Sequence, residues 1–169
     1  MIIIRESKVE DAKNIAACIQ QVCQERKYLA NTEGFSVEQT AAFIKSLSEN
    51  GGIQLICVDI DKVVGWCDIV PGSFEGFYQT GYLGMGLLEN YRSQGFGKRL
   101  LDKIIVIAFR RNFERLELEV FSTNIPAINL YKRVGFKQEG IKRKARKLDN
   151  EYDDIVIFGL LKNEWHTLG

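Results

Sequence analysis

The chain has 169 residues, of which 46% are apolar and 27% are charged, and its formal net charge is +1. This length suits one ordinary domain with one core, and the composition is that of a soluble globular protein. The near-neutral charge argues against a general affinity for nucleic acid, which usually needs a more basic surface. The sequence has no repeat, low-complexity tract or linker, so we expect residues 1–169 to form a single domain.

The four cysteines contain no CxxC pair, and the single histidine, His166, completes no zinc-site spacing. Their positions in apolar helix and strand patterns predict buried free thiols, which suit a reducing cytoplasm. The opening segment MIIIRESK has only three consecutive isoleucines, too few for a signal peptide or a spanning helix. We therefore expect a cytoplasmic protein without a metal site or a membrane segment.

The first elements predicted along the chain are one strand and two helices. Residues 2–5 are a strand candidate, and Ser7 with Glu10 predicts a capping box for a helix with apolar positions between residues 12 and 23. The sequence SVEQ at residues 36–39 repeats the capping signal for a second helix. The glycines of ENGG then provide the left-handed turn that ends it.

Strands dominate the remainder, with two helices between them. Residues 53–60 and 62–70 flank Asp61 as a hairpin, and residues 80–88 predict a strand that contains three glycines. The later elements are a helix around residues 100–108, a strand at 115–121, a helix at 126–134, and strands at 136–148 and 152–161. The order β-α-α-β-β-β-α-β-α-β-β predicts an α/β fold with a mixed sheet and helices on both faces.

The segment NYRSQGFGKRLL, residues 90–101, places two glycines where a helix should begin. A helix N-terminus presents unpaired N–H groups, and glycine lets a phosphate approach them closely. A nucleoside triphosphate would need GxxxxGK[ST], which fails at Arg92 and Arg99. A dinucleotide would need GxGxxG in the first βα unit, and the GMGLLE sequence lacks the third glycine. The pyrophosphate of coenzyme A, which needs the same cradle, is the third ligand considered.

Two motifs support that third ligand. Residues 92–97, RSQGFG, match R/Q-x-x-G-x-G/A, and residues 124–136, NIPAINLYKRVGF, match N-x-x-A-x-x-L-Y-x-x-x-G-F. In this order and spacing the chain resembles the GCN5-related N-acetyltransferases along nearly its whole length. The resemblance implies a GNAT-like acyl-CoA N-acyltransferase fold with a splayed central sheet. Acetyl-CoA would lie in the V-shaped opening between residues 81–88 and 115–121.

The resemblance also implies which residues hold acetyl-CoA. The pantetheine arm would pair with the strand edge around residues 85–88, and the pyrophosphate would meet backbone N–H groups between residues 92 and 98. Asn124 would hydrogen-bond the arm, or serve only as a helix cap. The predicted cofactor-binding residues are Met85, Leu87, Leu88, Arg92, Ser93, Gln94, Gly95, Phe96, Gly97, Lys98, Asn124 and Tyr131.

Acetyl transfer to an amine needs a base, a donor to the thioester oxygen and an acid for the departing thiolate. The resemblance places Tyr131 as the acid, although a packed aromatic is the alternative. A backbone N–H near Leu87 or Leu88 would stabilise the oxyanion through a strand distortion. Glu117 and Glu119, on the polar face of their strand, are the candidate bases.

Glu25, Tyr28 and Phe35 are the predicted acceptor-binding residues, because they follow the first helix near the expected acceptor side. Asp153 and Asp154 are weaker candidates, since two acids at a turn are usually solvated. The run KRKARK, residues 142–147, indicates either a site for RNA or an acidic substrate, or an edge strand protected by lysines, and the second interpretation fits the neutral chain better.

These features predict an N-acetyltransferase that moves an acetyl group from acetyl-CoA directly to a primary amine. The acceptor stays open between a free amino acid, a small amine or drug, and a protein N-terminus or lysine. A CoA-binding sensor or partner module without turnover is the alternative. Dimers are frequent in the family, so a homodimer is expected, and neither nucleic acid nor a membrane is an expected partner.

Overall fold

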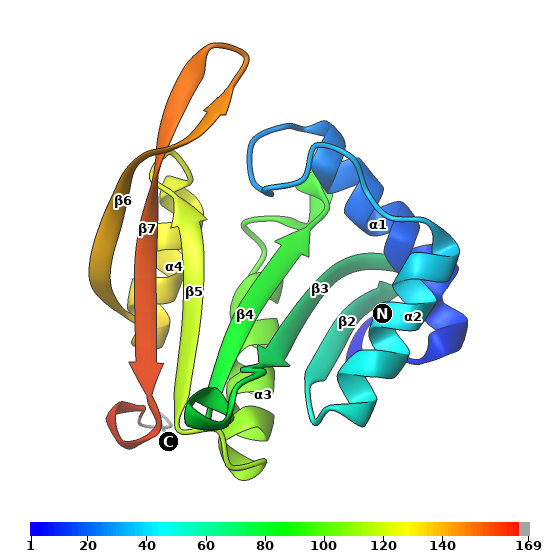
Figure 1. The fold of residues 1–169 in the computed structure, drawn as a ribbon. Coiled ribbons are helices and arrows are strands. Elements are labelled where there is room, and N and C mark those ends of the chain that lie inside the picture. Colours follow the sequence, from blue (N-terminus) through cyan, green and yellow to red (C-terminus); the bar gives the residue numbers. More distant parts are fainter. Residues whose placement is uncertain (166–169) are drawn as a thin grey trace.

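The computed structural model describes residues 1–165, and His166 lies outside the described residues. Its strands form one sheet of seven in the order β1-β2-β3-β4-β5-β7-β6 (Figure 1). The strands are β1 (Ile2–Glu6), β2 (Ile53–Asp59), β3 (Lys62–Pro71), β4 (Thr80–Leu87), β5 (Arg115–Phe121), β6 (Lys137–Leu148) and β7 (Glu151–Leu161). The helices are α1 (Ala12–Gln24), α2 (Val37–Glu49), α3 (Phe96–Arg110) and α4 (Ile125–Val134). The predicted element order and mixed sheet are confirmed.

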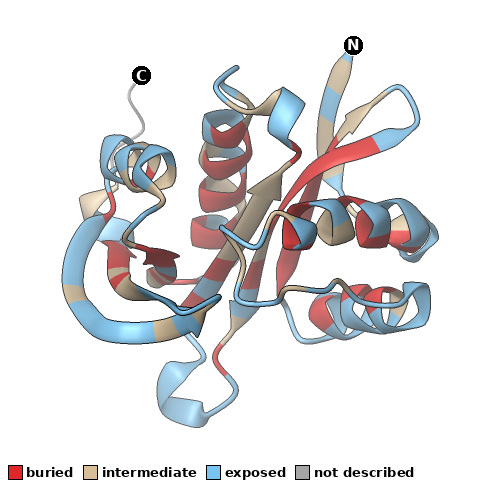
Figure 2. Ribbon diagram, turned by 90° about the horizontal axis from the view of Figure 1, so that it is seen from above, coloured by how far each residue is buried: buried red, intermediate tan, exposed pale blue. Residues whose placement is uncertain are grey.

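Helices cover both faces of the sheet, as the sequence predicts (Figures 1 and 2). Helices α1 and α2 lie on one face, and α3 and α4 lie on the other. The core is formed where amphipathic helices bury their apolar sides against the strands. The side chains of Ile15 in α1, Leu100 and Ile104 in α3, and Leu55 and Ile69 in the sheet have 0% exposure. Burial of this kind is the main favourable contribution to folding.

The first helix begins differently from the prediction. The capping box of Ser7 and Glu10 is wrong, because a short 3-10 turn (Val9–Asp11) precedes α1. The Asp11 carboxylate accepts a hydrogen bond from the Lys8 N–H at 2.8 Å and pairs with Arg5 at 2.7 Å. The hydrogen bond from Arg5 is the main reason that the pKa of Asp11 is lowered. An ionised carboxylate, here held in place by Arg5, accepts a stronger hydrogen bond from a backbone N–H than a serine hydroxyl does.

The capping box predicted at the start of α2 is confirmed. Ser36 Oγ accepts a hydrogen bond from the Gln39 N–H at 3.1 Å, and Gln39 Oε1 accepts one from the Ser36 N–H at 2.9 Å. Gly51 follows the end of the helix with a φ of +78°, which is the left-handed conformation expected there.

Strands β4 and β5 are the only parallel neighbours in the sheet of residues 1–165, and they pair only where they begin. Residues 80–82 face residues 115–117, and the strands separate beyond that point (Figure 1). The predicted splayed sheet is therefore confirmed. The divergence leaves one edge of β4 without a strand partner in the middle of the molecule.

The basic run at residues 142–147 lies on β6, which is the edge strand of the sheet. Lys142 pairs with Glu119, and Arg146 pairs with Asp153. These contacts support the edge-strand interpretation. The predicted free and buried state of the four cysteines is also confirmed. Among the described residues, no helix combines the length and apolar character that a membrane crossing requires.

Substituting Ser36→Ala should lower the free energy of unfolding by about 1 kcal/mol, because it removes the side-chain acceptor for the Gln39 N–H. Urea unfolding followed by circular dichroism measures the change. Ser48→Ala, at an exposed position near the other end of α2, is the matched control and should change stability little. Equal losses for both variants would contradict the capping role.

Candidate functional site

A cleft of about 690 Å³ fills the opening between β4 and β5. Its walls come from the end of α1 and the loop after it, from β4, from the segment before α3, from β5 and from α4. The residues that line it include Tyr28, Gly84, Met85, Leu87, Arg92, Ser93, Gly95, Gly97, Lys98, Glu119, Asn124 and Tyr131.

The segment from Ser93 to Lys98 forms a cradle of backbone N–H groups at one end of the cleft. Gly95 has a φ of +84° and is the N-cap of α3, while Ser93 has a φ of +58°. Within the described residues, none of the N–H groups from 93 to 98 has an acceptor, and the first bond of the helix is Arg99 N–H to Gly95 O. Such a row of donors at the positive end of a 15-residue helix is suited to an anion.

The two glycines of this segment have different physical roles. A Cβ on Gly95 would meet nothing within 4 Å, so the left-handed backbone alone requires glycine there. A Cβ on Gly97 would lie 3.1 Å from Leu130 Cδ2 and 3.5 Å from Leu87 Cδ1. Gly97 therefore lets α3 pack closely against α4 and β4, which fixes where the row of donors points.

The edge of β4 forms the next part of the cleft wall. The Leu88 N–H donates to Val64 O at 2.9 Å, so this donor is committed to β3. Backbone groups of successive residues in a strand point to opposite sides, so Met85 and Leu87 direct theirs away from β3, toward the cleft. The pairing of β3 with β4 runs through Leu87 without a register shift, so the expected distortion near Leu87 is wrong. The separation of β5 exposes the edge instead.

Arg92 links three parts of the cleft wall. Its guanidinium makes two bonds to Glu25, at 2.7 Å and 2.5 Å, and its Nε donates to Leu87 O at 2.9 Å. It also lies 4.6 Å from the centre of the Tyr28 ring. Arg92 and Glu25 therefore neutralise each other and join the end of α1 to the end of β4.

Tyr131 and Asn124 lie on the opposite wall, on and before α4. Tyr131 is 7% exposed and packs against Phe136 and Phe158, with ring centres 5.9 Å and 6.2 Å away. Burial is the main reason that the pKa of its phenol is raised, so the group keeps its proton at neutral pH. Asn124 Oδ1 accepts a hydrogen bond from the Ala127 N–H at 3.3 Å, which confirms its role as the cap of α4.

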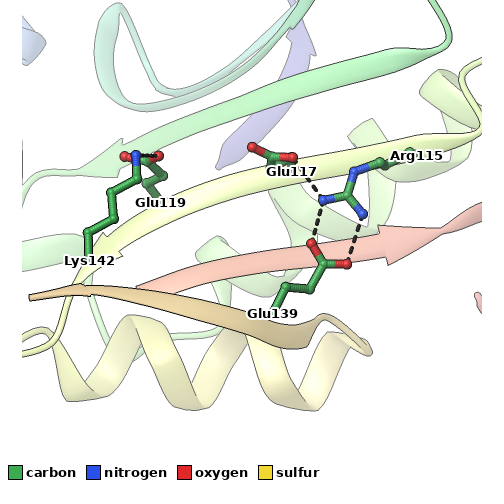
Figure 3. Close-up of polar contacts among 5 residues, drawn as sticks. All are labelled: Arg115, Glu117, Glu119, Glu139 and Lys142. Atoms are coloured by element: carbon green, nitrogen blue, oxygen red, sulfur yellow. Dashed lines mark hydrogen bonds and ion pairs between the residues drawn. The ribbon is translucent and has the colours of Figure 1, made fainter. Parts of the chain in front are cut away.

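The two glutamates of β5 are both paired with cations (Figure 3). Arg115 lies between Glu117 and Glu139 and bonds to both, at 2.8 Å in the case of Glu117. The hydrogen bond from Arg115 is the main reason that the pKa of Glu139 is lowered. Glu119 reaches the cleft but is bonded to Lys142. Neither carboxylate can meet an acceptor amine without leaving its cation, which reduces the case for either residue as the base.

The structure brings together most of the predicted site. Tyr28, Met85, Leu87, Arg92, Ser93, Gly95, Gly97, Lys98, Glu119, Asn124 and Tyr131 line the cleft. Predicted residues that do not line it are Glu25, Phe35, Leu88, Gln94, Phe96 and Glu117. Leu88 is buried, Phe35 is 47% exposed, and Glu25 touches the site through Arg92.

One ionisable residue near the cleft was missed by the sequence analysis. Asp68 lies on β3 beside Gly84, whose ideal Cβ position is 3.2 Å from Asp68 Oδ1. Burial raises the pKa of this carboxyl to about 7, against a smaller lowering by a hydrogen bond from Gln54. The signal in the sequence was a single acid in the otherwise apolar strand segment VVGWCDIV. In residues 1–165 no group of three or more His, Cys, Asp or Glu is placed to hold a metal ion.

The geometry defines a site for a ligand with a phosphate at one end and an extended arm that runs along a strand edge. Residues 19–136 match the sequence profile of the acetyltransferase (GNAT) family. The match covers more than half of the chain, which therefore belongs to the GNAT acetyltransferase family.

Individual relatives agree with this assignment. The chain is 26% identical to the N-acetyltransferase p20 of Bacillus licheniformis, across 96% of this chain and 93% of the relative. It is 27% identical to the L-amino acid N-acetyltransferase AaaT of Escherichia coli, across 95% and 98% of the two chains. The solved structure of yncA from Salmonella typhimurium with its cofactor acetyl-CoA superposes with a TM-score of 0.91 at 18% identity, covering 100% of this chain and 98% of the other.

Substituting Arg92→Ala should lower the free energy of unfolding by about 1–3 kcal/mol, because Glu25 and Leu87 O lose their partner in a partly buried place. Chemical denaturation measures it. Lys98→Ala removes an exposed cation of the same segment and should change stability by less than about 0.5 kcal/mol. An unchanged stability for Arg92→Ala, together with lost acetyl-CoA binding, would instead assign Arg92 to the phosphate.

Proposed function

We propose that the protein is an acetyl-CoA-dependent N-acetyltransferase that transfers the acetyl group directly to a primary amine. The observation that carries the proposal is the row of unpaired N–H groups at residues 93–98 beside the unpaired edge of β4. A pyrophosphate joined to a strand-like amide arm uses both features at once. The wall residues Met85 and Leu87 would pair with the arm, and Gly95 and Gly97 would keep the cradle open.

The chemistry follows from the groups along the cleft. A neutral amine attacks the thioester carbonyl carbon, and the oxygen gains negative charge that an N–H of the β4 edge, at Met85 or Leu87, would stabilise. Tyr131, which remains protonated, would donate a hydrogen bond to the leaving thiolate. Asn124 caps α4 beside the path of the arm. Burial raises the pKa of all four cysteine thiols, which makes an acyl-cysteine intermediate unfavourable.

The acceptor would enter from the side of the sheet that carries α1. The loop after α1 forms one wall through Tyr28, and the hairpin of β6 and β7 forms the other. Arg26 pairs with Asp149 at 2.9 Å, and Arg146 donates to Arg26 O at 2.9 Å, so the two walls meet. An amine panel distinguishes among an amino acid, a small amine and a protein amine as the acceptor.

The proposed function is tested with a panel of primary amines, which should include amino acids, polyamines, aminoglycosides and peptides with free N-termini. Release of free coenzyme A thiol from acetyl-CoA is the signal, and mass spectrometry identifies the acetylated product. Amine-dependent release supports the enzyme. Tight binding of acetyl-CoA without thiol release across the whole panel would favour a CoA-binding module without turnover.

Substituting Gly95→Asp should reduce acetyl-CoA affinity at least a hundredfold, because it places a carboxylate in the proposed pyrophosphate cradle. Gly95→Asn is the matched control, since asparagine also tolerates a positive φ and carries no charge. Isothermal titration calorimetry compares the two variants with the parent protein. If Gly95→Asp and Gly95→Asn bound acetyl-CoA with equal affinity, the pyrophosphate would not bind at this segment.

Substituting Tyr131→Phe should lower kcat at least tenfold and leave acetyl-CoA affinity within about twofold, because only the hydrogen-bond donor to the leaving thiolate is lost. The aromatic packing on Phe136 and Phe158 remains in this variant. Steady-state kinetics and calorimetry give the two quantities. A parallel loss of turnover and binding would make Tyr131 a packing residue.

A further inference from the structure

We propose that Asp68 is the general base that takes the proton from the acceptor ammonium. The assignment rests on the proposed acetyl transfer and adds to it the residue that makes the amine nucleophilic. Amines are largely protonated at neutral pH, so a base must act before attack.

Asp68 lies in the middle of three cross-strand neighbours on the α1 face of the sheet. Gln54 of β2 pairs with Asp68 of β3, and Asp68 pairs with Gly84 of β4. Cross-strand partners present their side chains on the same face, so the three positions form one row. The row ends at the cleft, because Gly84 is one of the cleft-lining residues, whereas Asp68 and Gln54 lie behind it.

Gly84 has no side chain between the Asp68 carboxylate and the cleft wall. Asp68 Oδ1 is 3.2 Å and Asp68 Cγ is 3.9 Å from the position that a Cβ of Gly84 would occupy. An amine bound against Gly84 on this face would therefore meet Oδ1 directly or through one water. The next residue of β4, Met85, directs its N–H to the cleft, so a donor to the thioester oxygen lies one position along β4 from Gly84, the cross-strand neighbour of Asp68.

Three other carboxylates in or beside the cleft are held by cations, whereas Glu89, which also lines the cleft, is exposed and forms no ion pair among residues 1–165. Glu25 is bonded to Arg92, Glu117 to Arg115, and Glu119 to Lys142. Within the described residues, no ion pair is formed by Asp68. Its cross-strand neighbour on β2 is the neutral Gln54, whose Oε1 is buried and has no partner among those residues.

Burial raises the pKa of Asp68 from 3.8 to about 7, a value suited to a base that works at neutral pH. The packed elements present few titratable groups to this face. They are Tyr82 on β4 and the buried thiols of Cys18 and Cys23 on α1, while the buried residues of α2 (Thr40, Ile44 and Leu47) have none. On β3 itself, the charge of Asp68 helps raise the pKa of Cys67.

The proposed transfer conserves atoms and charge. The Asp68 carboxylate accepts one proton from R–NH₃⁺, and the resulting R–NH₂ attacks the carbonyl carbon. A C–N bond forms, the C–S bond breaks, and the thiolate leaves with a second proton that the attacking nitrogen gives up. Asp68 then releases its proton to solvent. The sum is one ammonium and one acetyl-CoA converted to one amide, one free thiol and one proton.

The test is Asp68→Asn, a substitution of nearly equal shape, assayed with an amine that the parent protein acetylates. At pH 7 kcat/KM should fall about 10²–10⁴-fold, while acetyl-CoA affinity stays within about twofold. The parent profile should lose activity below about pH 7, because protonated Asp68 cannot accept a proton. In Asp68→Asn, activity should instead rise with pH in proportion to the fraction of the acceptor amine that is unprotonated. Asp61→Asn, in the exposed turn between β2 and β3, is the control and should behave as the parent protein.

Stability separates a catalytic from a merely structural role. Because the folded-state pKa lies above the unfolded value, ionised Asp68 destabilises the fold as pH rises toward 7. Asp68→Asn should therefore be more stable than the parent protein, with a difference in urea midpoint that grows from pH 4 to pH 7 and then levels off. A loss of activity in a more stable protein is not a folding defect.

A second measurement needs no acceptor amine. The ¹³C shift of the Asp68 carboxyl, assigned by its absence in Asp68→Asn, should titrate near pH 7. A titration below pH 5, or a variant that keeps both the activity and the acid limb, would overturn the assignment. A parent protein that acetylates no amine in the panel would overturn the proposed function and, with it, the role of Asp68. The last result is distinguished from the others because the parent protein itself is inactive.

Discussion

The separation of β4 from β5 is the constraint on which the rest of the structure depends. Two parallel strands that pair over only three residues leave backbone donors and acceptors of β4 unpaired inside the molecule. Unpaired backbone groups are costly when buried, so such an edge persists where water or a ligand can pair with it. Helix α3 starts at the same opening, and its first N–H groups face the same space. The fold thus concentrates unused hydrogen-bonding capacity in one cleft.

Several carboxylates in and around this cleft are paired with cations. Arg92 holds Glu25, Arg115 holds Glu117 and Glu139, and Lys142 holds Glu119. These pairs also connect elements that are distant in sequence, from α1 to the end of β4 and from β5 to β6. Asp68 differs because it forms no ion pair among the described residues and has the neutral Gln54 as a cross-strand neighbour. Carboxylates in ion pairs hold the elements together, and Asp68 is the carboxylate proposed to take part in the chemistry.

Much of the fold and part of the site could be predicted from local sequence. Ser36 and Gln39 bond within one helical turn, and Gly95 needs a backbone that only glycine adopts easily, so both features are visible in short segments. The start of α1 could not be predicted from Ser7, because Arg5 and Asp11 decide it together. Glu25, the partner of Arg92, lies 67 residues away in the sequence. No local pattern could therefore show that Arg92, which the sequence predicts to bind phosphate, is already paired with a carboxylate.

The sequence by itself determined the order of the elements, the anion cradle and the family motifs, because each depends on residues that are close along the chain. Tertiary structure alone decided which carboxylates are neutralised, that Leu88 gives its N–H to β3, and that Asp68 lies over Gly84. These properties depend on strand order and on the register between strands, which bring distant residues together. The basicity of a carboxylate is set by such neighbours and by burial, and neither can be read from its own segment of the chain.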